Sequence, residues 1–165
     1  MYDSSARLAE KITEFELGLL VYEFLHRPNP FTVKPSLIAQ EYEPRQLPPI
    51  PTKSRFSRGL QRLAGELLRK KPVDRLSASQ AVSVLQCLLW GPPASFLEDP
   101  GLTERNLQQW LATEQAKKVA SMCELCIPRF GDSDTGYSLS DQLQCQFLSD
   151  TSPMSLLQSM EVLYS

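Results

Sequence analysis

The stretch SRGLQRLAGELLRKKPVDRLSASQAVSVLQCLLWGP, residues 57–92, decides the fold that this sequence predicts. Five apolar residues between Leu60 and Leu68 follow the i, i+3, i+4, i+7, i+8 spacing of an amphipathic helix. Pro72 ends that helix, since proline cannot donate into the helical hydrogen-bond ladder. Ser77 and Gln80 form the capping-box pattern that begins a second helix. Two consecutive helices therefore occupy this stretch.

The chain before this stretch predicts a third helix over residues 9–26, AEKITEFELGLLVYEFLH. Its centre is apolar nearly all round, and a helix without a polar face is normally buried on every side. Residues 28–56 follow with seven prolines and little helical periodicity, apart from a short turn around residues 36–42.

The Gly-Pro-Pro sequence at residues 91–93 is the clearest boundary in the chain. Beyond it we expect helices over residues 104–126, after Ser138 and after Ser152. Asp141 completes a capping box with Ser138, and Pro153 suits the first position of the last helix. We find no convincing strand and no internal repeat, so the predicted fold class is all-α.

Size and composition are those of a soluble protein. The chain has 165 residues, 42% hydrophobic and 22% charged, and a net charge of −2 that gives no reason to expect nucleic acid as a partner. The N-terminus lacks the apolar segment of a secretory signal, and no apolar run approaches the roughly 20 residues of a membrane span. We therefore expect a cytoplasmic protein without membrane insertion, whose four cysteines are reduced thiols.

The stretch TEFELGLLVYEFL, residues 13–25, resembles the buried central helix of the lower lobe of protein kinases. Gly18 falls at the glycine of the kinase pattern, Tyr22 and Glu23 at its Tyr-Glu pair, and Arg75 at the arginine near the end of kinase domains. The resemblance implies that residues 1–92 are the C-terminal part of a protein-kinase-like lobe.

A narrower resemblance is carried by YEFLHRPNPF, LPPIP, SRGLQRLA and especially VLQCLLWGP, which are similar to the PEAK/Pragmin family of pseudokinases. This family consists of catalytically inactive scaffolds that dimerise through helices flanking the pseudokinase domain. The resemblance implies that residues 93–165 form a helical dimerisation extension, and that the partner is the chain itself or a related pseudokinase. It also implies a role in tyrosine-kinase signalling and cell migration, at the cytoskeleton or focal adhesions.

The sequence does not predict an enzyme. Phosphoryl transfer depends on positioned metal and base, and the chain contains no G-x-G-x-x-G, H-R-D or D-F-G motif. Thr13 stands where kinases place the aspartate that steadies the catalytic loop. The sequence also begins at this helix, without counterparts of the upper lobe or of the N-terminal dimerisation helix. An active kinase segment would need all of these parts from elsewhere.

No metal site or cofactor is predicted. The only histidine, His26, lies at a helix end, and a capping or solvent-facing role is favoured over catalysis. Cys123 and Cys126 have the C-x-x-C spacing of zinc and redox sites, but Cys87 and Cys145 are scattered singly. We favour core packing for these thiols.

One segment offers a different function. Arg45, Pro48 and Pro51 match the R-x-x-P-x-x-P pattern that SH3 domains bind as a polyproline helix. An SH3-docking adaptor module is therefore the alternative to the scaffold. Kinase-like lobes carry a proline-rich loop at this place, so we favour a structural role for these prolines.

The helices after residue 93 each have one apolar stripe that must be buried, against the lobe or against a second chain. The stripe patterns leave the two choices equal, and the resemblance favours the dimer. Trp110 and Leu111 are the predicted anchors, because buried aromatic residues tend to dominate interface energies. The full predicted interface comprises Leu107, Trp110, Leu111, Leu139, Leu143, Phe147, Leu156 and Met160.

Overall fold

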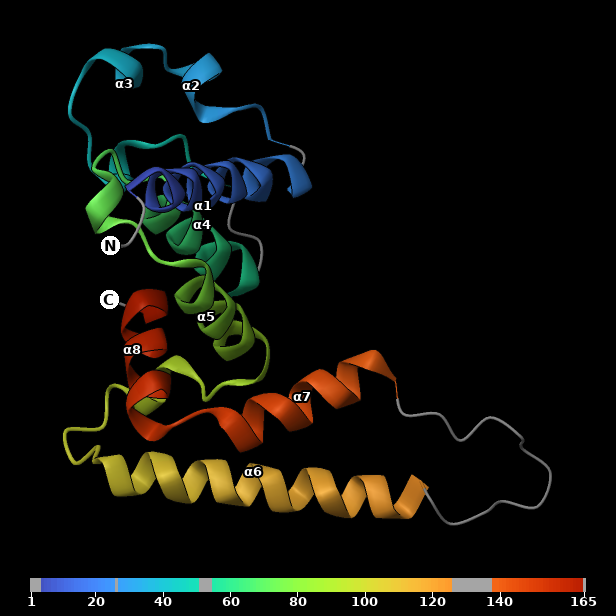
Figure 1. The fold of residues 1–165 in the computed structure, drawn as a ribbon. Coiled ribbons are helices and arrows are strands. Elements are labelled where there is room, and N and C mark those ends of the chain that lie inside the picture. Colours follow the sequence, from blue (N-terminus) through green and yellow to red (C-terminus); the bar gives the residue numbers. More distant parts are fainter. Residues whose placement is uncertain (1–3, 26, 51–54, 126–137, 165) are drawn as a thin grey trace.

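The computed structural model describes residues 4–25, 27–50, 55–125 and 138–164, which form a stack of helices (Figure 1). These described ranges contain no strand, so the predicted all-α class is confirmed. The elements of the first part are α1 (Ser4–Phe24), α2 (Pro30–Val33), α3 (Ser36–Ala39), the 3-10 turn η1 (Pro44–Gln46) and α4 (Arg55–Leu67). The second part contains η2 (Pro72–Asp74), α5 (Ala78–Trp90), η3 (Ala94–Phe96), α6 (Glu104–Leu125), α7 (Leu139–Asp150) and α8 (Pro153–Tyr164).

Helix ends follow the capping residues that the sequence contains. Ser77 begins α5 and Ser138 begins α7, and in both cases the reciprocal capping-box contacts are formed, with Gln80 and Asp141 respectively. These contacts satisfy backbone N–H groups that have no partner inside the helix. Pro153 opens α8 as predicted. Local sequence therefore sets where these helices begin.

Helix α1 corrects one expectation. It begins before residue 9, and it is not buried on every side, because the side chains of Ile12, Leu20 and Phe24 are 50%, 42% and 79% exposed. The helix lies across α4 near one end of the stack, so only the side facing α4 and the proline-rich loop is covered (Figure 1). The prediction that α1 is buried on every side was therefore wrong, although the helix is apolar nearly all round.

Helix α4 is the shared layer between two hydrophobic clusters. Ala64 and Leu68 belong to an upper cluster, together with Tyr22 of α1 and residues of the proline-rich loop. Leu63 and Leu67 belong to a lower cluster, together with residues of α5, α6, α7 and α8. Because Leu67 and Leu68 are both fully buried, α4 has contacts on two sides and connects the upper and lower halves.

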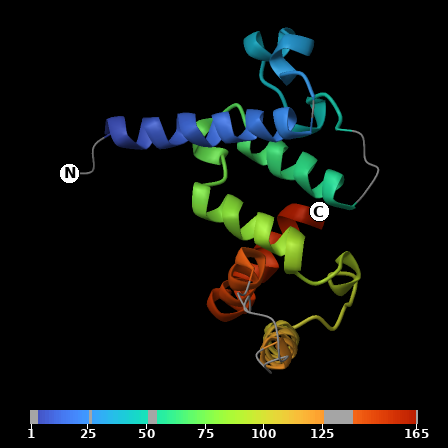
Figure 2. The same cartoon turned by 90° about the vertical axis from the view of Figure 1, so that its right-hand side faces the viewer.

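The lower cluster continues across the predicted division of the chain at residues 92 and 93. Helix α8 returns from the far end of the stack and packs on α5 and α4 (Figure 2). Its Leu156, Met160 and Leu163 are almost completely buried in the same cluster as Val84 and Leu88 of α5. The Gly-Pro-Pro sequence therefore marks a turn of the chain, while one core spans both sides of it.

Helices α6 and α7 form an arm at the end of the stack opposite to α1 (Figures 1 and 2). The two helices lie side by side, and α6 also contacts α8. At about 1.5 Å per residue, the 22 residues of α6 make it roughly 33 Å long, so its distal half extends beyond the core. Within the described ranges no helix has the length and apolarity to cross a membrane.

Candidate functional site

Two of the kinase-like positions hold the upper cluster together. The hydroxyl of Tyr22, a residue only 1% exposed, donates a hydrogen bond of 2.9 Å to the backbone carbonyl of Pro48. Gly18 lies directly against α4, where a Cβ on this residue would come within 2.8 Å of Leu68 Cγ. Tyr22 therefore attaches the proline-rich loop to α1, and Gly18 permits the close approach of α1 to α4. Glu23 is exposed on α1.

Arg75 connects three segments through its guanidinium group. Its nitrogens donate to the backbone carbonyls of Arg69, Lys70 and Lys11 at 2.8, 3.2 and 2.8 Å. The group also lies 4.8 Å from the centre of the Phe15 ring. Burial lowers the pKa of Arg75 from its usual value, and an arginine still stays charged in proteins. All three nitrogens have backbone partners, so the role of Arg75 in this chain is structural.

A pocket of about 370 Å³ lies beside Arg75, between α1 and the α3 region. Its aromatic wall consists of Phe15, Phe31 and Tyr42, whose rings follow one another at centroid distances of 5.4 and 5.8 Å. The Tyr42 hydroxyl donates to the carbonyl of Leu68, and burial raises the pKa of Tyr42. No aspartate, glutamate, histidine or cysteine lines this pocket. Of its titratable residues, Lys70 donates to the carbonyl of Ile38 and Tyr42 to that of Leu68, so both already bind the backbone of the lobe.

The proline-rich segment is packed on the lobe. Arg45 and Pro49 are exposed, but Leu47 and Ile50 are only 5% and 3% exposed in the upper cluster. The Pro48 carbonyl accepts the Tyr22 hydrogen bond, and the N–H of Ile50 donates to Gln61 Oε1. Pro51 lies outside the described residues. An SH3 domain would have to detach Leu47 and Ile50 to enclose this segment, and this packing favours the structural interpretation of the prolines.

The eight residues predicted for the dimer interface separate into two groups. Five of them are at most 6% exposed and belong to the lower cluster of this same chain, and Trp110 packs on that cluster while remaining half-buried. Only Leu139 and Leu143 are exposed, by 70% and 39%. The five buried residues are Leu107, Leu111, Phe147, Leu156 and Met160. Leu111 is therefore not free to anchor a partner, because α6 uses it to attach to its own core, whereas Trp110 keeps part of its surface in water.

Polar contacts between α6 and α7 hold the arm. Lys118 of α6 lies 2.5 Å from Asp141 Oδ1, and Asp141 also accepts from the N-cap residue Ser138. The hydrogen bond from Lys118, followed by that from Ser138, lowers the pKa of Asp141 to about 2. The thiol of Cys145 lies 3.1 Å from the Met122 sulfur, on the same side of the arm.

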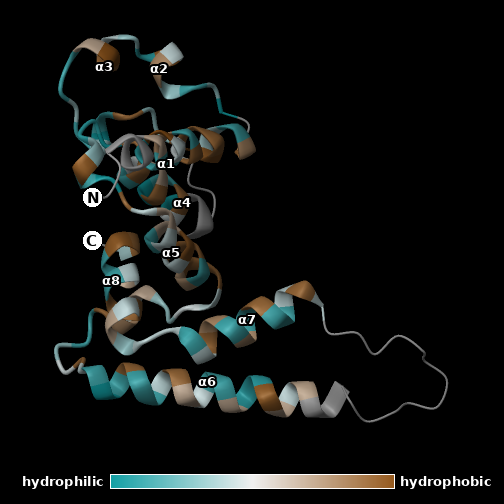
Figure 3. Ribbon diagram, viewed as in Figure 1, coloured by the Kyte–Doolittle hydropathy of each residue, from teal (hydrophilic) through white to brown (hydrophobic). Residues whose placement is uncertain are grey.

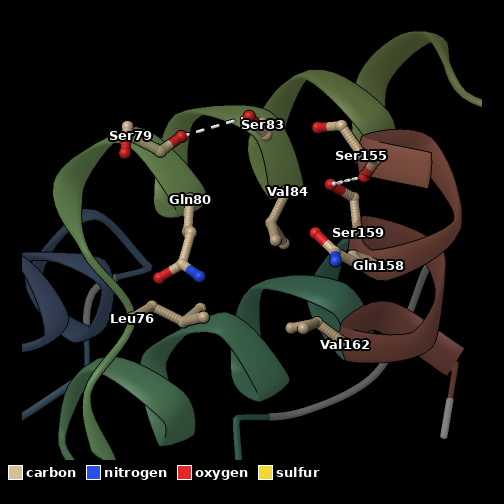
Figure 4. A pocket seen from close by; sticks show the side chains of 9 residues that line it. All are labelled: Leu76, Ser79, Gln80, Ser83, Val84, Ser155, Gln158, Ser159 and Val162. Atoms are coloured by element: carbon tan, nitrogen blue, oxygen red, sulfur yellow. Dashed lines mark hydrogen bonds between the residues drawn. The ribbon is translucent and has the colours of Figure 1, made fainter. Parts of the chain in front are cut away.

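A small pocket of about 220 Å³ lies between α5 and α8 (Figure 4). Two of the serines in its wall use their hydroxyls within their own helices, since Ser83 donates to the carbonyl of Ser79 and Ser159 to that of Ser155. No charged side chain lines the pocket. It offers neither a nucleophile with a base nor a charged group for a ligand.

The described part of the chain contains no group of three residues able to hold a metal ion. His26 and Cys126 lie outside the described residues, and the side chain of Cys123 is not described. Cys87 is a free thiol only 1% exposed, and burial raises its pKa to about 12, which makes it a packing residue. At the kinase-like position of Thr13, the hydroxyl donates to the carbonyl of Ala9, one turn earlier in α1.

Sequence reasoning missed a cluster of arginines. Arg45 follows Pro44 in η1, and Arg58 and Arg62 lie one turn apart on α4; all three line one pocket of about 400 Å³. The i, i+4 spacing of two arginines within residues 57–92 was the available indication, but nothing in the sequence places Arg45 beside them.

No protein-family model matches the chain, but individual proteins do. The "Inactive tyrosine-protein kinase PRAG1" of Homo sapiens is 39% identical over 163 residues, which is 96% of this chain and 11% of the relative. The "Inactive tyrosine-protein kinase PEAK1" of Homo sapiens is 43% identical over 145 residues, which is 84% of this chain and 8% of the relative. This chain thus spans about a tenth of the length of these curated relatives.

The fold is also similar to the crystal structure of the pseudokinase PEAK1 (Sugen Kinase 269). The TM-score is 0.83 at 40% sequence identity, over 94% of this chain and 42% of that one. The relatives carry the word inactive in their names, which agrees with the prediction that this chain is not an enzyme.

Proposed function

Since this chain belongs to the PEAK/Pragmin family of inactive tyrosine-protein kinases, we propose that it is part of a non-catalytic scaffold that associates with a second copy, or with a related pseudokinase, through the arm of α6 and α7. The observation that carries the proposal is a set of apolar side chains left in water on this arm. Val119 of α6 is 52% exposed, and Leu139 and Leu143 of α7 are 70% and 39% exposed. Hydrophobic residues recur along both helices of the arm in Figure 3.

Burial of Val119, Leu139 and Leu143 in a dimer would contribute a substantial free energy of association. Fully burying a valine or leucine side chain contributes about 1.5–3 kcal/mol. In a two-fold dimer each patch is used twice, because the same surface faces itself. Three partly exposed residues per chain can therefore supply several kcal/mol toward association.

The arm is also prepared for binding by its own contacts. The Lys118–Asp141 ion pair and the capping box at Ser138 fix the start of α7 on α6. At the other end, Leu111 and Phe147 hold both helices in the lower cluster. A surface ordered before binding loses less conformational entropy on association. The buried residues predicted as anchors would then act indirectly, by holding the exposed ones in place.

The proposal is tested by light scattering across a concentration series. For the wild-type chain we expect the molar mass to rise from 18.6 kDa toward twice that value. The variant Leu139→Glu/Leu143→Glu places charges on exposed positions, so it should keep its helical circular dichroism and remain a monomer. A matched control is Val33→Glu/Val73→Glu, two exposed apolar residues of α2 and η2, which should dimerise like the wild type. A wild type that stays monomeric at every concentration would refute self-association by this chain.

SH3 docking through Arg45, Pro48 and Pro51 remains the alternative, and no contact of the described residues favours it. It predicts binding of an SH3 domain that is lost on Pro48→Ala, whatever the oligomeric state. Because Leu47 and Ile50 are buried, we expect that an SH3 domain binds neither the wild type nor Pro48→Ala in a fluorescence-polarisation assay with labelled chain.

By family membership we further propose a cytoplasmic location, at the cytoskeleton or focal adhesions, and a part in tyrosine-kinase signalling and cell migration. A fluorescent fusion of the Leu139→Glu/Leu143→Glu variant tests whether this location depends on association. Loss of the adhesion pattern in the variant, at equal expression, is the expected result. An unchanged pattern in the variant would show that the location does not depend on self-association.

A further inference from the structure

The pocket between η1 and α4 brings three arginines together, although exposed arginines need no common pocket to remain solvated. It has a volume of about 400 Å³, and Arg45, Arg58 and Arg62 line it together with Pro44 and Val162. The arginines come from two elements, η1 and α4, and Val162 of α8 also lines the pocket.

A glycine on α4 lets η1 approach closely enough to form the pocket. Gly65 is buried, and a Cβ at this residue would lie 3.0 Å from the Pro44 Cβ. Pro44 therefore packs on α4 one turn beyond Gln61. Arg45 follows directly in η1, and its exposed side chain joins those of Arg58 and Arg62.

The positive charge of the pocket is not balanced within the described part of the chain. The ion pairs of the described residues involve none of Arg45, Arg58 and Arg62. Glu66 also lines the pocket, but its carboxylate accepts two hydrogen bonds, of 2.6 and 3.0 Å, from Arg69. Like charges four residues apart on a helix, such as those of Arg58 and Arg62, repel each other and destabilise the helix. An anion from outside the chain would relieve this repulsion.

We propose that the pocket binds the phosphorylated side chain of a phosphotyrosine in a partner peptide. A phosphate monoester carries about −1.5 to −2 charges at neutral pH, which matches several guanidinium groups better than a single carboxylate does. Guanidinium groups bind phosphate through paired, charge-assisted hydrogen bonds. The aromatic ring packs between Pro44 and Val162, and the volume lies within the range of about 300–1,000 Å³ of small-molecule sites.

A peptide fits these observations better than a membrane. Recognition of anionic lipid surfaces uses clusters of about four to eight basic residues beside the membrane, whereas this pocket has three arginines and the chain has a net charge of −2. A pocket of this kind accepts a single inserted side chain, whereas a membrane presents a broad surface of headgroups. The proposal also gives Arg45 a function that does not need the neighbouring prolines to leave the lobe.

The test is a titration of the full 165-residue chain, labelled with ¹⁵N, with phenyl phosphate and with a phosphotyrosine flanked by two glycines on each side. We expect the Gly65 amide signal to shift with saturation, while that of Gly101, in the loop before α6, stays in place. Arg62→Gln and Arg58→Gln should each weaken binding tenfold or more, because each removes charge-assisted hydrogen bonds to the phosphate. Arg105→Gln, an exposed arginine at the start of α6, is the matched control and should bind like the wild type.

Four results would overturn the proposal. The first is equal binding of the unphosphorylated peptide, and the second is inorganic phosphate binding as tightly as phenyl phosphate, which would indicate an adventitious ion only. The third is equal weakening by Arg105→Gln and Arg62→Gln, which would indicate general electrostatic attraction. The fourth is binding to phosphatidylserine vesicles that the same two pocket variants abolish and the peptide cannot displace, which would assign the pocket to a membrane surface. Circular dichroism of each variant checks that the fold is retained.

Discussion

The hydroxyl of Tyr22 should stabilise the chain at neutral pH and destabilise it in strong alkali. Replacing Tyr22 by phenylalanine removes the 2.9 Å hydrogen bond to the Pro48 carbonyl, for which we expect a loss of about 1 kcal/mol in the free energy of unfolding at pH 7. Burial raises the pKa of Tyr22 from 10.0 to about 12. A group whose pKa is raised on folding contributes stability that is complete below its unfolded pKa and is lost as the pH rises through the folded value.

The magnitude follows from this shift. One pKa unit corresponds to about 1.4 kcal/mol, so at pH 11 the wild type has lost roughly 1.4 kcal/mol through Tyr22 alone. That loss exceeds the gain from the hydrogen bond. The variant Tyr22→Phe should therefore be less stable than the wild type at pH 7 and slightly more stable at pH 11, with equal stability between pH 10 and 11.

Urea unfolding followed by circular dichroism at pH 7, 9, 10 and 11 measures this reversal. Other groups that titrate in alkali are common to both proteins and cancel in the difference. The reasoning is refuted if Tyr22→Phe is less stable than the wild type by the same amount at pH 7 and at pH 11.

Arg75→Lys should lower the free energy of unfolding by about 2 kcal/mol, because one ammonium group cannot reach the three carbonyls that the guanidinium binds. Urea unfolding at pH 7 measures this loss, and a change below about 0.5 kcal/mol would contradict the structural role of Arg75. Asp141 should titrate near pH 2 in an NMR pH series. Its pKa is lowered on folding, so its contribution to the docking of α7 should be present above pH 4 and lost as the pH falls toward 2; a midpoint near 3.8 would disprove the contact with α6. Cys87, with its pKa raised to about 12, should react with a thiol reagent at pH 8 only after unfolding in urea, and rapid labelling of the native chain at this residue would show that the lower cluster opens.

The sequence by itself determined the helices and most of their ends. Ser77, Ser138 and Pro153 begin helices where predicted, because capping depends on residues within one turn of each other. The 3.6-residue periodicity around Leu63 and Leu67 likewise predicted α4 and its buried side. The resemblance to the PEAK/Pragmin family came from short stretches of sequence, and comparison with known proteins confirmed it.

Only the tertiary structure decided what covers each apolar stripe. An apolar stripe indicates that one face of a helix is buried, but it does not identify the surface that buries it. Leu111 and Leu156 were therefore equally compatible with a second chain and with the core of their own chain. The return of α8 onto α5 buried them within the chain and left Leu139 and Leu143 in water. The meeting of Arg45 with the α4 arginines depends in the same way on packing between segments distant in sequence, which local patterns of residues do not encode.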